Sequence, residues 1–185
     1  MHRVSNRDVI AVKRGIFVGR FQPPHKGHLE AIKNILKKVD ELVIILGSSQ
    51  YSHSLDNPFT AGERLTMLRK ALEEEGIQRS RYWITPVPDV NLHMLWVSQI
   101  VGYSPKFEVV YTNEPLTHRL FMEAGFKVEP VSFIKRKIYS ATEIRKRILN
   151  RENWEELVPR SVGALIKEID GLARLRELIK TDVVT

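Results

Sequence analysis

The stretch between residues 15 and 46 constrains the fold more than any other part of the sequence. Residues 15–18, Gly-Ile-Phe-Val, form a short apolar run of the kind found in buried strands. Residues 42–46, Leu-Val-Ile-Ile-Leu, form a second such run, as expected of a parallel strand covered on both faces. Between them, apolar residues recur at helical spacing, at Leu29, Ile32, Ile35, Leu36 and Val39. The pattern predicts a right-handed βαβ unit, the repeating element of a parallel sheet.

The alternation of strand and helix continues through residue 131. We expect a helix from Thr60 to Glu75, because Thr60 and Glu63 have the spacing of a capping box and Gly76 can end the helix. Strands are expected at 82–85, 107–111 and, shorter, at 128–131, with a helix over 94–101. From residue 141 onward only helical spacing is found, with these inward positions: Ile144, Ile148, Val162, Leu165, Ile169, Leu172, Leu175 and Leu178.

These elements predict an α/β fold, doubly wound, with a mostly parallel, Rossmann-like sheet that binds its ligand at the carboxyl ends of the strands. The 185 residues contain no repeat and no linker, and 43% of them are hydrophobic, which is sufficient for one packed domain. We expect an N-terminal extension at 1–14, the α/β domain at 15–150, and a helical C-terminal segment at 151–185 that packs on the same domain.

The remaining composition narrows the functional classes. The absence of cysteine excludes disulfides and thiolate chemistry. There is no apolar stretch long enough for a membrane span or a signal peptide, so we expect a cytoplasmic protein that does not bind membranes. A net charge of +7 favours an anionic partner. Because the positive charge is spread, and is dense only at 135–137 and 145–147, a small polyphosphate explains it as well as a nucleic acid does.

Residues 19–28, Gly-Arg-Phe-Gln-Pro-Pro-His-Lys-Gly-His, lie between the first strand and the first helix, where such folds bind ligands. Gly27 lets a phosphate approach the backbone, and the start of a helix favours negative charge. His25 and His28 are three residues apart and share a helix face. With Arg20 they form a set of donors that could hold phosphate oxygens and stabilise developing charge without a metal. The alternative is a pair of surface or capping histidines.

A second helix start is expected at residue 140. Ser140 and Glu143 have capping-box spacing, and a plain helix N-cap is the simplest interpretation of this stretch. The sequence contains no nucleophile elbow, no Walker A motif and no kinase signature. Asn113, after the strand expected at 107–111, is a candidate ribose or adenine contact by its position, although an Asn-Glu-Pro loop needs no ligand to form.

Residues 19–28 resemble the GRFQPxHxGH signature of the archaeal-type nicotinamide mononucleotide (NMN) adenylyltransferases, within the HxGH nucleotidyltransferase superfamily. Further matching pieces span residues 15 to about 165: Gly47 and Ser48, the run 58–64, Asp89 with Trp96, and the run 139–145. The last of these resembles the family's I-S-S-T-x-x-R signature, with Tyr139 in place of one serine and Ala141 at another position. The hydroxyls of Ser140 and Thr142 are retained.

The resemblance implies that AMP is transferred from ATP to NMN by direct in-line attack of the NMN phosphate, which gives NAD and pyrophosphate. The implied catalytic residues are Arg20, His25, His28 and Arg145. The predicted ATP contacts are Gly19, Arg20, Phe21, His25, Gly27, His28, Asn113, Ser140, Thr142 and Arg145. The implied NMN contacts are Phe21, Gly47, Ser48, Asp89 and Trp96. Mg²⁺ is expected to be carried mainly by the ATP phosphates, with no metal ligand from the protein.

The resemblance also implies a homo-oligomer, with a hexamer as one expected form, and no nucleic-acid partner. At Asp56 the family can carry a basic residue directed toward phosphate, so that contact is not transferred to this chain. Three alternatives remain at this stage. Trp96 could simply belong to the core, the acceptor could differ, as in phosphopantetheine, cytidylyl or FMN-type transfer, or the chain could be a non-catalytic nucleotide-binding or nucleic-acid-binding protein.

Overall fold

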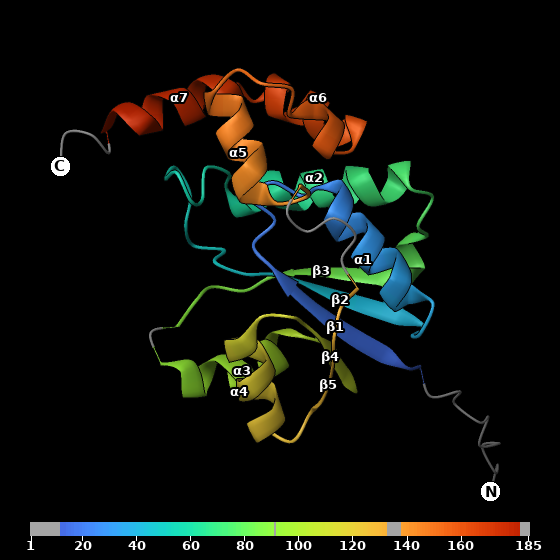
Figure 1. Cartoon of the computed structure of the whole chain (residues 1–185). Helices are drawn as coiled ribbons and strands as arrows, with labels where there is room; N and C mark the ends of the chain where they lie inside the picture. Colours follow the sequence, from blue (N-terminus) through green and yellow to red (C-terminus); the bar gives the residue numbers. More distant parts are fainter. Residues whose placement is uncertain (1–11, 91, 133–137, 182–185) are drawn as a thin grey trace, which may run out of the picture.

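A parallel sheet organises the chain. The computed structural model describes residues 12–90, 92–132 and 138–181. Within them the strands are β1 (Arg14–Gly19), β2 (Glu41–Leu46), β3 (Tyr82–Pro86), β4 (Val109–Tyr111) and β5 (Lys127–Glu129). Their order is β3-β2-β1-β4-β5, and every pair is parallel (Figure 1). The chain therefore winds outward from central β1 in both directions, which confirms the doubly wound fold and places the switch point at the end of β1.

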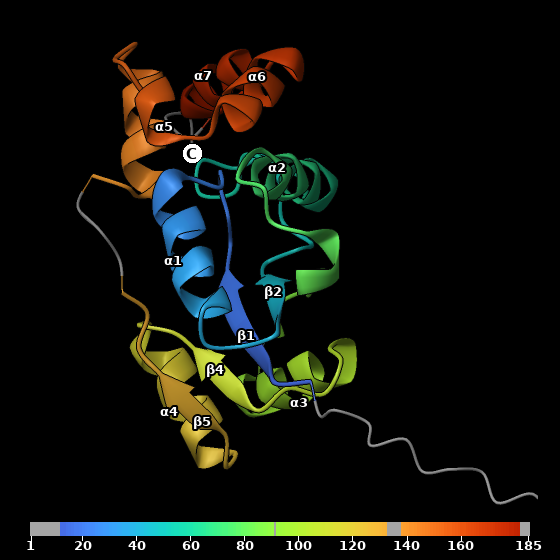
Figure 2. The same ribbon diagram turned by 90° about the vertical axis from the view of Figure 1, so that its right-hand side faces the viewer.

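Helices cover both faces of this sheet. α1 (Lys26–Leu36) and α2 (Ala61–Glu74) lie on one face, and α3 (His93–Tyr103) and α4 (Pro115–Glu123) on the other (Figures 1 and 2). Successive residues of β2 show why both faces are covered. Ile44 packs in the core shared with α1 and α2, while Ile45 packs in the core shared with α3 and α4. The uninterrupted apolar run at 42–46 is thus explained.

The structure corrects two expectations on the second half of the sheet. The strand expected at 107–111 begins only at Val109, because Phe107 stacks on Phe126, with ring centroids 4.9 Å apart, instead of joining the ladder. The strand expected at 128–131 is β5, at 127–129. Helix α4 was not expected. It starts where the sequence suggested a loop, because the Glu114 side chain accepts backbone N–H groups and Pro115 occupies the first turn.

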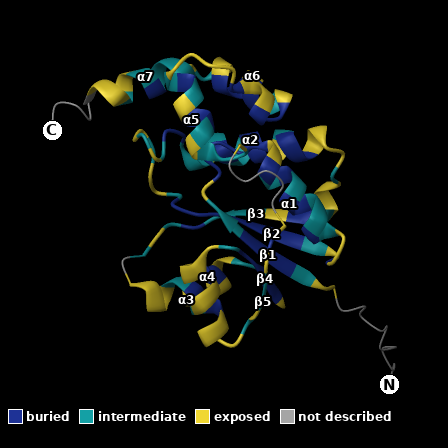
Figure 3. Ribbon diagram, in the orientation of Figure 1, coloured by how far each residue is buried: buried dark blue, intermediate teal, exposed yellow. Residues whose placement is uncertain are grey.

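The C-terminal helices pack on the α1 and α2 side of the molecule. They are α5 (Ala141–Leu149), α6 (Arg160–Glu168) and α7 (Gly171–Thr181), and short 3₁₀ turns occur at Arg79–Arg81 and Glu155–Leu157. Ile144, Val162 and Leu175 are fully buried in the core that α2 lines. Figure 3 shows that α6 combines buried and exposed positions, as expected of a helix with one face on the core. A Cβ at Gly171 would lie 2.9 Å from the Phe59 ring, so this helix approaches the domain closely.

Most inward positions expected in this segment are buried, whereas Ile169, Leu172 and Leu178 are half-buried. In the described part of the chain, no helix combines the length and the apolar character that a membrane crossing requires. Most of the extension expected at 1–14, and the basic residues at 135–137, lie outside the described residues.

Candidate active site

Two clefts contain most of the residues singled out from the sequence. The first has a volume of about 220 Å³. Its lining consists of Arg20, Phe21, Gln22, His25, His28, Tyr139, Ser140, Ala141, Thr142 and Arg145. All four residues expected to be catalytic are therefore brought together, although 117 positions separate His28, in the first turn of α1, from Arg145 on α5. Gln22, Tyr139 and Ala141 were not among the expected site residues.

His25 and His28 cap α1 reciprocally. His25 is the N-cap residue, and its Nδ1 accepts the backbone N–H of His28 at 3.2 Å, while Nδ1 of His28 accepts the backbone N–H of His25 at 3.3 Å. The two rings stack with centroids 3.6 Å apart. An imidazole that accepts at Nδ1 carries its proton on Nε2 when it is neutral. The capping arrangement therefore fixes one tautomer in both rings and leaves each Nε2–H as a donor.

Burial keeps both imidazoles neutral. It lowers the pKa of His25 from 6.5 to about 3, and it lowers the pKa of His28 well below its usual value, with repulsion from His25 acting in the same direction. The site near neutral pH therefore presents two uncharged N–H donors, and its positive charge comes from Arg20 and Arg145. The capping histidines considered as an alternative and the phosphate donors expected from the motif are the same two side chains, acting through different nitrogens.

The start of α5 forms the opposite wall of the first cleft. Ser140 is the N-cap residue and its Oγ accepts the backbone N–H of Glu143 at 3.1 Å. The Glu143 carboxylate does not return to Ser140, as a capping box would require, because it accepts the Arg147 guanidinium one turn later, at 2.9 Å. The expected capping box is therefore only half formed, and Glu143 points away from the cap.

Arg145 connects the two helix starts. Its side chain is only 8% exposed, and its guanidinium donates to the Gln22 carbonyl at 2.9 Å and to the Asp56 carboxylate at 3.3 Å. Burial lowers the Arg145 pKa, and the Asp56 charge opposes this shift.

The two helix starts approach each other closely at Gly27. A Cβ at Gly27 would lie 2.9 Å from the Tyr139 Cβ. Gly27 is thus required for the close approach of the two helix starts.

The second cleft, of about 250 Å³, lies between α3 and α4. It is lined by Asp89, Val90, His93, Trp96, Leu116, Thr117 and Leu120. Asp89 is oriented by Ser48, whose backbone N–H and Oγ both donate to its carboxylate, at 3.1 and 2.7 Å. The Trp96 ring packs edge-on against Phe121, with centroids 5.7 Å apart, and also lines the cleft. Trp96 therefore makes the core contact that the sequence left open and also faces the cleft, while its stacking on a nicotinamide ring stays a prediction.

Asn113 is not brought to either cleft. Its side-chain amide donates to the Val131 carbonyl, and its amide oxygen accepts the Val131 backbone N–H at 2.9 Å. The side chain thus closes the connection between the ends of β4 and β5. Its expected contact with ATP receives no support from this placement.

Arg64, on α2, is completely buried and contacts the loops that follow β1 and β2. Its guanidinium donates to the carbonyls of Arg20 at 2.7 Å, Gly47 at 2.9 Å and Ser48 at 3.0 Å. Burial lowers its pKa to about 10, with Asp89 raising it and Arg20 lowering it, so the side chain stays charged at neutral pH. Although the run 58–64 was noted in the sequence, nothing local marked Arg64, because the carbonyls it binds come from distant loops.

The first cleft can hold a chain of phosphates between two helix N-termini, each supplied with N–H or hydroxyl donors and an arginine. A second cleft, in which Ser48 binds Asp89, offers an indole face and an oriented carboxylate. Such a pair of sites suits group transfer between two bound phosphorylated molecules, which is the chemistry of a nucleotidyltransferase. The chain belongs to the cytidylyltransferase-like family, whose model matches residues 16–147, and within it to the archaeal-type NMN adenylyltransferases.

Three curated relatives illustrate this membership, and each is named nicotinamide-nucleotide adenylyltransferase. The Archaeoglobus fulgidus protein is 52% identical over 91% of this chain and 99% of its own length. The Pyrococcus furiosus protein is 51% identical over 90% of this chain and 89% of its own. The Saccharolobus solfataricus protein is 49% identical over 92% of this chain and 99% of its own.

Solved structures share the fold. A bifunctional NMN adenylyltransferase/ADP ribose pyrophosphatase from Francisella tularensis superposes with a TM-score of 0.75 at 21% identity. The match covers 90% of this chain and 53% of that protein, so this chain spans about half of its length. The same protein in complex with AMP and a manganese ion gives a TM-score of 0.73 at 23% identity.

Proposed function

We propose that this protein is an NMN adenylyltransferase, which transfers AMP from ATP to NMN and releases NAD and pyrophosphate. The observation that carries the proposal is the facing pair of helix starts: the histidine pair at α1 and the Ser140–Arg145 segment at α5 line one cleft. The names of the relatives, which are about half identical over nine-tenths of the chain, support the same reaction.

In this proposal the triphosphate of ATP lies between the two helix starts. An oxygen of the NMN phosphate forms a bond to the α-phosphorus, while the bond from that phosphorus to the bridging oxygen breaks and its electron pair leaves with pyrophosphate. The attacking phosphate is already ionised, so no general base is required, and catalysis consists of positioning and charge stabilisation. The Nε2–H groups of His25 and His28 donate to phosphate oxygens, and Arg20 and Arg145 offset the charge that shifts toward the leaving group.

The divalent ion belongs to the substrate in this proposal. The lining of the first cleft includes no carboxylate, and the described residues contain no group of three or more His, Cys, Asp or Glu side chains that could hold a metal ion. This donor set fits a metal that arrives on the ATP phosphates. Bound there, Mg²⁺ would neutralise charge on the departing pyrophosphate. In this proposal the hydroxyls of Ser140 and Thr142, which line the first cleft, bind the same phosphates.

The second cleft is the proposed site of the acceptor base. The Trp96 indole offers a face on which a cationic pyridinium ring can stack, and the Asp89 carboxylate adds favourable charge. Gly47 and Ser48 lead from the ATP cleft to Asp89, since Gly47 donates its N–H to the Gly19 carbonyl at 3.0 Å and Ser48 binds Asp89. Phe21, beside His28 in the first cleft, is included in both the ATP and the NMN contacts.

We include a cytoplasmic location and a homo-oligomeric assembly, such as a hexamer, in the proposal, with no nucleic-acid or membrane partner. The surface of α3 supports self-association, because it exposes the apolar side chains of Met94, Leu95, Val101 and Tyr103. Light scattering coupled to gel filtration measures the assembly directly.

The test of the function is an acceptor screen. Pyrophosphate release from ATP and Mg²⁺ is measured with NMN, nicotinic acid mononucleotide, phosphopantetheine and FMN in turn, and with CTP in place of ATP. Rapid turnover with NMN and ATP supports the proposal. Turnover with another acceptor and none with NMN refutes it. Salt-dependent binding of nucleic acid without turnover of any acceptor would instead support the binding-protein alternative.

A further inference from the structure

Arg64 is unusual among the inward residues of α2. The neighbouring buried positions, Met67, Leu68 and Ala71, are all apolar, whereas Arg64 brings a fully buried cation to the same face. Among the described residues no carboxylate lies within ion-pair distance of it, and its guanidinium donates only to backbone carbonyls. Burying a cation in this way is costly unless its donors are satisfied by good geometry. The contacts of the side chain therefore have to explain its presence.

Those contacts link two loops, one with Arg20 of the first cleft and one with Ser48, which binds Asp89 of the second cleft. Nη1 donates both to Arg20, in the β1–α1 loop, and to Gly47, directly after β2, while Nη2 donates to Ser48. These carbonyls lie beyond the ends of the strands, where the sheet supplies no further partners. Only the planar guanidinium has enough fixed donors to span several such carbonyls at once.

The backbone that Arg64 holds is strained. Phe21 and Ser48 both have left-handed backbone conformations, with φ of +52° and +50°, although neither is glycine. Such conformations persist where the surroundings fix them, and they are common where a site requires a particular geometry. Arg64 binds the carbonyl of the residue before Phe21 and the carbonyl of Ser48 itself. One side chain thus fixes both strained turns.

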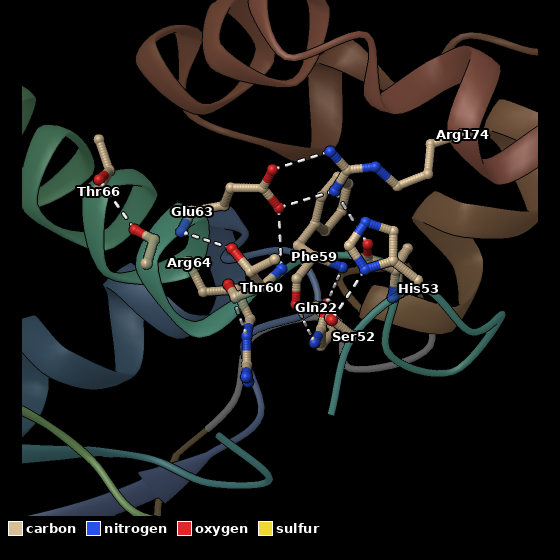
Figure 4. Close-up of polar contacts among 11 residues, drawn as sticks. Gln22, Ser52, His53, Phe59, Thr60, Glu63, Arg64, Thr66 and Arg174 are labelled. Atoms are coloured by element: carbon tan, nitrogen blue, oxygen red, sulfur yellow. Dashed lines mark hydrogen bonds and ion pairs between the residues drawn. The ribbon is translucent and has the colours of Figure 1, made fainter. Parts of the chain in front are cut away.

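The position of Arg64 is itself fixed from the other side of α2. The preceding residue, Glu63, points away from the sheet and accepts two bonds from Arg174 of α7, at 2.8 and 2.9 Å (Figure 4). Glu63 also accepts the Thr60 backbone N–H at 2.8 Å, which completes the capping box of α2. The Arg64 Nε donates to the Thr60 carbonyl at 3.3 Å. The first turn of α2 is therefore held in place by contacts on both sides.

We infer that Arg64 is a positioning residue for the transfer reaction: it holds the Arg20 loop and the Gly47–Ser48 loop at a fixed separation. Through the bonds from Ser48 to Asp89, it also fixes the position of the second cleft, proposed for the acceptor, relative to the first cleft, proposed for ATP. The inference rests on the proposed function. Because in-line displacement is sensitive to alignment, a shift of about 1 Å between the two substrates can cost on the order of 100-fold in rate.

The experiment compares Arg64→Lys and Arg64→Ala with Met67→Ala, a control that shortens an equally buried but apolar side chain of α2, which cannot donate hydrogen bonds to either loop. Kinetics are measured with saturating ATP and the acceptor that the parent protein uses, well below each variant's Tm. We expect kcat to fall on the order of 100-fold in both Arg64 variants, with KM values within about threefold of the parent. Met67→Ala should lower Tm and leave kcat unchanged.

Two further measurements separate positioning from folding. Methylguanidine at millimolar concentration should restore part of the kcat of Arg64→Ala, because it can occupy the vacated space and donate to the same carbonyls, and it should have no effect on Met67→Ala. Amide hydrogen exchange of residues 19–22 and 47–50 should accelerate in Arg64→Lys without substrates. A kcat of Arg64→Lys within threefold of the parent, or loss of folding in both Arg64 variants, overturns the inference. A parent protein with no turnover refutes the proposed function instead, and the exchange measurement still tests the link between the loops.

Discussion

The neutral state of His25 predicts a specific loss of stability in mild acid. Its folded-state pKa is about 3, against 6.5 in the unfolded chain, so the unfolded chain binds a proton in a range where the folded protein does not. The free energy of unfolding must therefore fall as the pH falls below 6.5. Between pH 7 and pH 5 the linkage amounts to about 2 kcal/mol from His25 alone, at roughly 1.4 kcal/mol per pKa unit. His28 adds to this loss, because burial lowers its pKa as well.

The assay is urea denaturation at pH 7 and pH 5, without nucleotides, for the parent and for His25→Asn. Asparagine retains the ability to cap a helix but does not titrate, so the variant isolates the protonation of His25 from its capping role. The drop in unfolding free energy between the two pH values should be about 2 kcal/mol smaller in His25→Asn than in the parent. His118→Gln, which removes an exposed histidine of α4, controls for the loss of an imidazole and should behave as the parent.

Equal pH dependence in His25→Asn and the parent would refute the reasoning. It would mean that His25 is already protonated in the folded protein, which requires Nδ1 to donate instead of accepting the His28 backbone N–H. The inference that His25 and His28 present Nε2–H donors to the first cleft would then lose its basis.

Four other predictions address the two clefts. Arg145→Ala should raise the KM for ATP more than that for the acceptor, with partial recovery in Arg145→Lys, and unchanged ATP kinetics would remove Arg145 from the site. Asp56→Asn, which frees Arg145 from its exposed partner, should lower the KM for ATP by less than about fivefold, and an increase would contradict the pairing. Trp96→Ala should weaken acceptor binding by about 0.5 to 2 kcal/mol, with a milder effect in Trp96→Phe, and a lower Tm with unchanged acceptor KM would make it a core residue only. His28→Ala should lower kcat by about 10²- to 10³-fold with little change in the KM for ATP, and turnover within threefold of the parent excludes catalysis by His28.

The parts of the fold that the sequence predicted are those with local signals. The apolar runs of β1 and β2 and the capping residues Thr60 and Glu63 are contiguous or closely spaced, and their elements were placed within one or two residues. Helix α4 was missed because Asn-Glu-Pro has the composition of a turn. In this chain Glu114 uses its carboxylate as the N-cap, and Phe121 supplies the burial that a short helix needs.

In the candidate site, too, the sequence predicted features with a local signal and missed those that depend on tertiary packing. The spacing of His25 and His28 predicted two adjacent imidazoles, but it could not predict that each Nδ1 caps the other residue's backbone, which decides the tautomer. Arg64 could not be found from spacing, because its partners come from loops that tertiary packing brings together. Asn113 was expected to contact a ligand because it follows a strand. Its side-chain amide instead forms hydrogen bonds with the backbone of Val131, 18 positions further along the chain.

The ion pair between Glu63 and Arg174 has a consequence for the newly made chain. The two residues are 111 positions apart, so the ribosome has added the loops after β1 and β2 and all five strands before it adds the partner of Glu63. Until residue 174 has left the exit tunnel, the first turn of α2 lacks its outer support, and the Pro58 carbonyl lacks the Arg174 donor. The growing chain can therefore form the loops after β1 and β2 before α7 exists, but the first turn of α2, which carries Arg64, gains its contacts with Arg174 only after α7 has emerged.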